Sequence, residues 1–169
     1  YAVIPLFMRG LGAPDYIVIS SAGIFSIVIA MPTMFSAALG RNIRNIKRAV
    51  IAVHCIILVV TFMMGFTFTF FDSSLVNGAW KTYLAYFIMY AFAIGIIVPI
   101  WADFLNQSTL RSHRGRFFGI GFAFNSIGSF IGGGALRYLL TQDFSFPKNF
   151  GIGFFILFFS LTIGTILFL

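Results

Sequence analysis

Apolar residues fill five long segments of the chain, and short polar connectors separate these segments. A helix rises about 1.5 Å per residue, so a helix that crosses a bilayer needs about 20 apolar residues. The predicted spans are residues 15–39, 49–71, 82–104, 117–140 and 150–169. Residues 1–8 resemble the last turns of another helix. The pattern predicts an all-α, polytopic membrane helix bundle in one transmembrane domain (residues 1–169), with five full transmembrane helices and the end of a sixth.

Basic residues concentrate in alternate connectors, which must lie on the same face of a membrane. Residues 40–48 and 105–116 hold seven of the eleven basic residues, namely Arg41, Arg44, Lys47, Arg48, Arg111, Arg114 and Arg116. The other connectors carry Asp15, Asp72 and Asp143 beside Arg9, Lys81 and Lys148. Short loops rich in Lys and Arg stay in the cytoplasm. Both basic loops are therefore predicted to be cytoplasmic, in a multi-pass protein of the cell (inner or plasma) membrane.

The composition requires lipid as the solvent. The chain is 60% hydrophobic and 9% charged, whereas soluble domains are about 25% charged. A soluble fold of 169 residues has too little interior to hide this apolar surface. The net charge of +7 raises the possibility of a nucleic-acid partner, but the charges lie between apolar runs, without basic and aromatic residues interleaved on a polar scaffold. We therefore expect no nucleic-acid partner.

Small residues recur at helical spacing within three of the spans. Close contact between small residues drives helix association in lipid, so these faces are predicted to pack inside the bundle. The three sets are Ala22, Ser26, Ala30, Thr33 and Ala37; His54, Leu58, Thr61, Gly65 and Thr69; and Gly121, Asn125, Gly128 and Gly132.

Three polar residues inside spans are candidates for a substrate cavity: His54, Tyr90 and Asn125. Intramembrane polar groups are costly and often functional. Each also has a structural interpretation, because Asn125 can bond another helix and His54 can be a satisfied neutral histidine. Tyr83 and Trp101 are predicted to belong to the interfacial aromatic belt.

The sequence contains no motif that indicates an enzyme. It contains no paired carboxylates, no H-E-x-x-H motif and no phosphate-binding loop, so we expect no enzyme activity and no cofactor. His54 and His113 lie at different levels of the bundle and cannot share a metal, so no metal site is expected. A single cysteine, Cys55, excludes a disulfide framework.

One junction resembles the major facilitator superfamily of secondary transporters. The resemblance is carried by Gly95, Pro99, the Trp101-Ala102-Asp103 sequence and the RGRFFG motif at residues 114–119. The basic loop GRNIRNIKRAV stands where that family has a cytoplasmic loop. Two residues depart from the family pattern. The family often has Arg where this chain has Ala91, and its antiporter motif has Pro where this chain has Gly133.

The resemblance implies the amino-terminal half of a transporter built from inverted three-helix repeats. A missing carboxy-terminal half would supply the other wall of the cavity. The expected function is secondary active transport of a small solute by alternating access, with proton or sodium as the coupling ion. The alternative is a membrane-embedded scaffold or assembly subunit without a transport cycle.

The sequence also predicts a gate at the cytoplasmic end of the bundle. Asp103 lies at the cytoplasmic end of its span, close in sequence to Arg111, Arg114 and Arg116. Charge-assisted hydrogen bonds between them would close one gate. The competing interpretation is a solvated loop, since exposed ion pairs contribute only about 0–1 kcal/mol.

Overall fold

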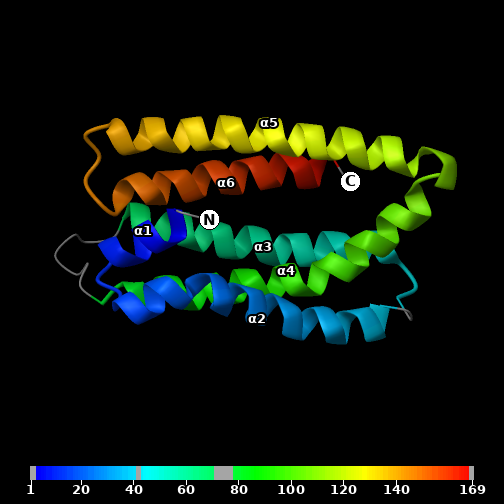
Figure 1. The fold of residues 1–169 in the computed structure, drawn as a ribbon, viewed down its shortest axis with the longest axis horizontal. Coiled ribbons are helices and arrows are strands. Elements are labelled where there is room, and N and C mark those ends of the chain that lie inside the picture. Colours follow the sequence, from blue (N-terminus) through cyan, green and yellow to red (C-terminus); the bar gives the residue numbers. More distant parts are fainter. Residues whose placement is uncertain (1–2, 41–42, 71–77, 168–169) are drawn as a thin grey trace.

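The structure is a computed structural model that describes residues 3–40, 43–70 and 78–167. Every regular element in these ranges is helical (Figure 1). The elements are α1 (Val3–Gly10), α2 (Asp15–Gly40), α3 (Ile46–Thr69), α4 (Trp80–Ser108), a 3-10 turn η2 (Arg111–His113), α5 (Arg114–Thr141) and α6 (Lys148–Ile166). The expectation of an all-helical chain is confirmed for this part of the protein.

Five helices, α2 to α6, are long and apolar enough to cross a membrane. Their bounds follow the predicted spans closely, but α4 continues four residues past residue 104 and α5 begins three residues before 117. A helix does not end where its apolar run ends, because polar residues at the membrane interface continue it. Residues 71 and 168–169 of the predicted spans lie outside the described residues.

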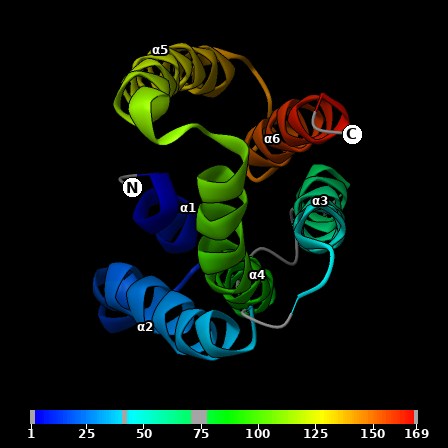
Figure 2. The same ribbon diagram turned by 90° about the vertical axis from the view of Figure 1, so that its right-hand side faces the viewer.

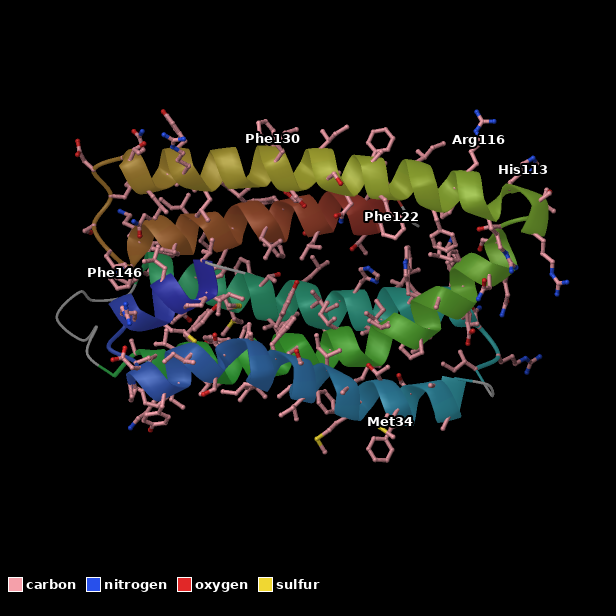
Figure 3. All side chains as sticks on the ribbon, in the orientation of Figure 1. Met34, His113, Arg116, Phe122, Phe130 and Phe146 are labelled. Carbon is pink, nitrogen blue, oxygen red and sulfur yellow. The ribbon has the colours of Figure 1, made fainter. Side chains whose placement is uncertain are left out.

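Successive helices run in opposite directions, so the connectors alternate between the two ends of the bundle (Figure 1). Helix α3 begins, and helix α4 ends, at the same end of the bundle. This end carries Arg44, Lys47, Arg48, Arg111, Arg114 and Arg116, and Figure 3 shows His113 and Arg116 there. Arg41 and Asp72 lie outside the described residues. The predicted gathering of basic residues at one end of the bundle is confirmed for these six residues.

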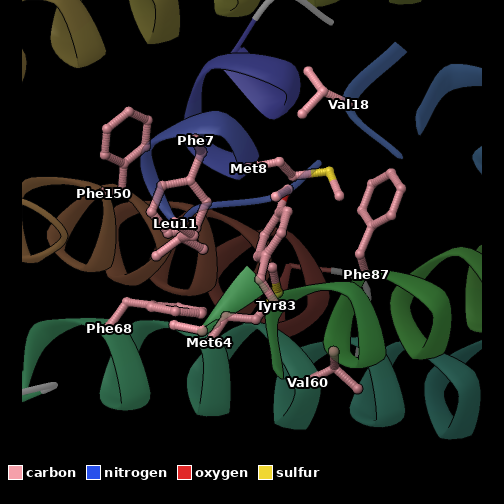
Figure 4. Close-up of a cluster of buried hydrophobic side chains, with 12 residues drawn as sticks. Phe7, Met8, Leu11, Val18, Val60, Met64, Phe68, Tyr83, Phe87 and Phe150 are labelled. Carbon is pink, nitrogen blue, oxygen red and sulfur yellow. The ribbon is translucent and has the colours of Figure 1, made fainter. Parts of the chain in front are cut away.

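An aromatic core at the opposite end joins α1, α3, α4 and α6 (Figure 4). Phe7 stacks on Phe150 with ring centroids 4.5 Å apart and meets the edge of Tyr83 at 4.8 Å. Such aromatic contacts add about 0.5–1.5 kcal/mol to the burial of their surface. Tyr83 is only 2% exposed, so its prediction as an interfacial belt residue is wrong.

Helices α3 and α6 pack tightly because glycines remove side chains from their contact. A Cβ atom on Gly151 of α6 would stand 2.6 Å from the carbonyl carbon of Phe68, and a Cβ atom on Gly65 of α3 would stand 2.9 Å from the Phe155 ring. Thr61 and Gly65, which belong to the small-residue face predicted for α3, are buried. This part of the packing prediction is confirmed.

Helices α2 and α4 cross where Pro99 interrupts the hydrogen bonds of α4. Proline has no backbone N–H, so the Gly95 carbonyl lacks its usual intrahelical donor. The Thr33 hydroxyl of α2 shares its proton between this carbonyl, at 2.9 Å, and the Ile29 carbonyl of its own helix, at 2.8 Å. Ser36 Oγ donates to the Gly95 carbonyl at 3.5 Å. A carbonyl that would be orphaned within lipid is thereby satisfied by the neighbouring helix.

The small-residue face predicted for α2 is largely wrong. Ala22, Ser26, Ala30 and Ala37 are exposed, and only Thr33 is half-buried. The buried polar positions of α2 are instead Ser21 and Ser36. The helix is rotated so that Thr33 and Ser36 reach the Gly95 carbonyl, which a stripe of alanines could not satisfy.

Helix α5 stands apart from α2, α3 and α4, as the end-on view in Figure 2 shows. It contacts α6 near its own C-terminal end, where Leu139 is buried and Leu136 approaches Gly153. The predicted packing of the α5 face is wrong, because Gly121, Asn125, Gly128 and Gly132 are all exposed. Added Cβ atoms on these three glycines would meet nothing within 4 Å. Phe130 also projects outward from α5 (Figure 3).

Candidate functional site

His54 lies two turns inside α3 and is half-buried. Its Nδ1 atom is 2.9 Å from the backbone oxygen of Val50. A carbonyl oxygen can only accept a hydrogen bond, so Nδ1 must carry the proton and donate. In the neutral ring, Nε2 is then a hydrogen-bond acceptor, and any partner it takes must be a donor.

Tyr90 and Trp101 of α4 meet His54 around a pocket of about 220 Å³. The His54 and Trp101 ring centroids are 6.0 Å apart at an interplanar angle of 61°, and Trp101 also stacks on Phe104. Aliphatic residues complete the lining, among them Leu58 and Leu161. Of the described helices, α3, α4 and α6 thus line a partly open, largely apolar pocket with three polar aromatic groups in its wall.

A second pocket of about 230 Å³ adjoins the first and shares His54, Trp101 and Leu161 with it. On the α6 side it is lined by Ser160 and Thr165. The Ser160 hydroxyl donates to the Ile156 carbonyl, and the Thr165 hydroxyl donates to the Leu161 carbonyl, both at 2.8 Å. We refer to the two pockets together as the His54–Trp101 site.

The structure brings together two of the three predicted cavity residues. His54 and Tyr90 line one pocket, whereas Asn125 is exposed on α5 and makes no hydrogen bond to another residue in the described part of the chain. Trp101, Ser160 and Thr165 were not predicted as site residues. Trp101 is predicted as a residue of the interfacial aromatic belt, because Trp is enriched at membrane surfaces, but its side chain is half-buried in the pocket wall. The recurrence of Ser160, Gly164 and Thr165 within the apolar α6 is the signal that could have indicated a polar lining.

The predicted gate residues are placed without an ion pair between them. Asp103 is exposed, and within the described ranges it pairs with none of Arg111, Arg114 and Arg116. Arg114 instead donates to the backbone oxygens of Asn106 at 2.6 Å and Thr109 at 3.4 Å. It therefore caps carbonyl groups at the C-terminal end of α4, where a cation also complements the helix dipole. The latch stays a prediction.

Replacing Arg114 with glutamine should loosen the end of α4. Loss of a charge-assisted cap costs about 1 kcal/mol, which corresponds to roughly fivefold faster amide exchange in a locally opening segment. Hydrogen exchange of the peptide covering residues 105–110 measures the effect. Arg116→Gln is the matched control, because Arg116 is exposed and no hydrogen bond from it to a described residue is present. Equal exchange in the two variants would contradict the capping role.

Residues that could hold a metal are not clustered. Within residues 3–40, 43–70 and 78–167, no three side chains of the types His, Cys, Asp or Glu come close enough to bind one ion. An ion pair joins Arg9 to Asp15 at 2.9 Å, and both side chains are mostly exposed. It lies at the end opposite the basic connectors.

Comparison of the chain with protein-family models, with curated proteins and with solved structures gave no match.

Proposed function

We propose that this chain is the amino-terminal half of a secondary transporter of the major facilitator type, which moves a small solute by alternating access. A carboxy-terminal half would supply the facing wall, and proton or sodium would be the coupling ion. Inverted repeats of α1–α3 and α4–α6 make α3 the counterpart of α6. Repeats of this kind are related by a pseudo-twofold axis in the membrane plane. The extended contact between α3 and α6 supports this arrangement, whereas the corresponding helices α2 and α5 stand apart.

The observation that carries the proposal is the His54–Trp101 site. Polar groups are expensive at membrane depth, so two adjoining pockets that hold His54 and Tyr90 in one and His54, Ser160 and Thr165 in the other favour a role beyond packing. Transport gives that reason, because a solute that leaves water must find replacement hydrogen bonds within the bilayer.

The exposed face of α5 favours a second candidate, a scaffold or assembly subunit. Asn125 lies among exposed glycines on this face, and two of them, Gly128 and Gly132, line a pocket of about 390 Å³ opposite α1, α4 and α6. Polar residues on small-residue faces join helices in lipid, so a helix of another chain could fill this space. A scaffold needs no pocket that opens alternately to the two sides of the membrane. Access to the His54–Trp101 site therefore separates the two candidates.

A single cysteine at the pocket tests for alternating access. Thr165→Cys in a Cys55→Ser background would be exposed to a membrane-impermeant maleimide in sealed right-side-out and inside-out vesicles. The transporter predicts labelling in both preparations, because the pocket opens to each side in turn. Phe130→Cys is the control and should stay unlabelled, since it projects from the middle of α5. Labelling of Thr165→Cys from one side alone would favour the scaffold.

A further inference from the structure

An apolar groove of about 660 Å³ lies between α2 and α4, and we call it the α2–α4 groove. One end of it is at Ile43, in the connector at the basic end of the bundle. Its α2 wall extends back to Val28, which stands about 18 Å from the helix end at Gly40 at a rise of about 1.5 Å per residue. One leaflet of a bilayer has a hydrocarbon depth of about 15 Å. The α2–α4 groove therefore extends through the leaflet on the side of the basic connectors.

The walls of the α2–α4 groove offer no hydrogen bond to an occupant. Met31 and Phe35 of α2 and Phe92 of α4 line it, and each is more than half exposed. Among the lining residues in the described part of the chain, Ser36 alone has a polar side chain, and its hydroxyl proton goes to the Gly95 carbonyl. A polar group that entered would lose its bonds to water without replacement. The walls therefore favour a hydrocarbon.

Positive charge stands where the α2–α4 groove meets the membrane surface. Arg44 follows Ile43 directly and Arg48 lies in the first turn of α3, and both side chains are exposed. Within the described ranges neither forms an ion pair, and Asp103 is the acidic residue at this end of the bundle. Basic residues next to a membrane attract anionic lipid headgroups. The positive-inside rule explains the charge of the connectors, but it does not explain an apolar groove that ends at one of them.

From the groove and the charge at its mouth we infer that the chain binds an anionic phospholipid, with an acyl chain in the α2–α4 groove and the phosphate at Arg44. A lipid of the surrounding leaflet itself forms the open side of the groove, so the site needs no wall beyond α2 and α4. The groove shares no lining residue with the His54–Trp101 site, and the inference does not depend on a transport cycle.

Quenching of a tryptophan by brominated lipids tests the occupant of the α2–α4 groove. The chain has two tryptophans, so Trp80→Phe and Trp101→Phe together remove the native fluorescence. Phe35→Trp then places a reporter in the groove. Met34→Trp is the matched control, because Met34 is the neighbouring residue at the same depth, does not line the groove and projects outward (Figure 3). Both reporters are reconstituted in phosphatidylcholine vesicles that contain increasing fractions of brominated phosphatidylglycerol or brominated phosphatidylcholine.

Brominated phosphatidylglycerol should quench the Phe35→Trp reporter at about fivefold lower fractions than brominated phosphatidylcholine, as expected for one arginine at an anionic headgroup. The Met34→Trp reporter should respond equally to the two lipids. Adding Arg44→Gln should abolish the fivefold preference. Arg116→Gln removes the same charge at the same end of the bundle but on α5, which stands apart from α2, and it should leave the preference unchanged. Equal losses in the two arginine variants would overturn the site at Arg44.

Other occupants of the groove give other results. Equal quenching of the Phe35→Trp reporter by the two lipids, or the same preference at both reporters, would overturn the specific anionic lipid. Quenching of the Met34→Trp reporter alone would mean that protein covers the groove, which would also overturn the inference. Thermal unfolding of the unsubstituted protein in detergent gives a second measurement. Added phosphatidylglycerol should raise its midpoint above that with phosphatidylcholine, Arg44→Gln should remove the difference, and coincident midpoints in the unsubstituted protein would contradict the lipid site.

Discussion

Valine at position 151 should lower the free energy of unfolding by about 3 kcal/mol, the upper part of the usual range for an overpacked contact. A Cβ atom there would stand 2.5 Å from Thr69 Oγ1 and 2.6 Å from the carbonyl carbon of Phe68, and it would also collide with the backbone nitrogen of Thr69. Side chains can turn away from a new atom, but backbone atoms of a helix cannot. The substitution must therefore push α6 away from α3.

The same substitution elsewhere on α6 provides the control. A Cβ atom on Gly164 would meet no atom within 4 Å, so Gly164→Val adds the same side chain without forcing the helices apart. Unfolding of both variants in mixed micelles of increasing SDS content, followed by circular dichroism, compares their stabilities. Gly151→Val should unfold at a clearly lower SDS fraction. Coincident transitions would mean that α3 and α6 do not meet at Gly151.

Gly95→Val should have the second largest effect, a loss of about 2–3 kcal/mol. The new Cβ atom would collide with the Ile29 carbonyl oxygen and the Pro32 ring, and it would stand 3.1 Å from the Ile29 carbonyl carbon. Separating α2 from α4 would also remove the 2.9 Å bond from Thr33 to the Gly95 carbonyl. That carbonyl has no donor within its own helix because of Pro99. The steric clash and the lost hydrogen bond therefore both lower the free energy of unfolding.

Ala102→Val is the matched control for Gly95→Val, because Ala102 lies on the same helix and is exposed. It should unfold like the unsubstituted protein in the same SDS titration. Hydrogen exchange of the peptide covering residues 92–98 gives a second measurement, since the loosened crossing exposes these amides in the Gly95 variant. Unchanged exchange and unchanged stability would mean that α2 and α4 do not pack together at Gly95.

Hydropathy predicts the helices well because the solvent imposes their length. Every backbone polar group within lipid must be satisfied inside its own segment, so a long apolar run has few alternatives to a helix. The predicted span 15–39 and the observed helix Asp15–Gly40 differ by a single residue. The alternation of the connectors then follows from chain continuity, and it places Arg44 and Arg116 at the same end of the bundle.

Which face of a helix packs inward is much harder to predict from the sequence. Helix α2 carries small residues on more than one face, with Ala22, Ser26 and Ala30 on one and Ser21 and Ser36 on another. Lipid and the protein interior are equally apolar, so burial of apolar surface does not determine which of these faces packs against another helix. The choice depends on a carbonyl of α4 that Pro99 leaves without a donor, which is a property of a different helix.

Rare polar residues within apolar runs can be marked from the sequence, but of His54, Tyr90 and Asn125 only the first two line the pocket. His54 and Tyr90 stand out within apolar runs. Ser160 and Thr165 resemble ordinary small residues of a membrane helix, because hydroxyls that bond their own helix are common in lipid. Their contribution becomes visible only when α6 is placed beside His54.

The membrane arrangement of the chain is tested most directly by finding on which side of the membrane its basic connectors lie. In a Cys55→Ser background, Lys47→Cys, His113→Cys and Phe144→Cys would be labelled with an impermeant maleimide in sealed vesicles of known orientation. Positions 47 and 113 should react from the same compartment, the cytoplasmic one, and position 144 should react from the other. Labelling of positions 47 and 113 from opposite compartments would contradict this arrangement.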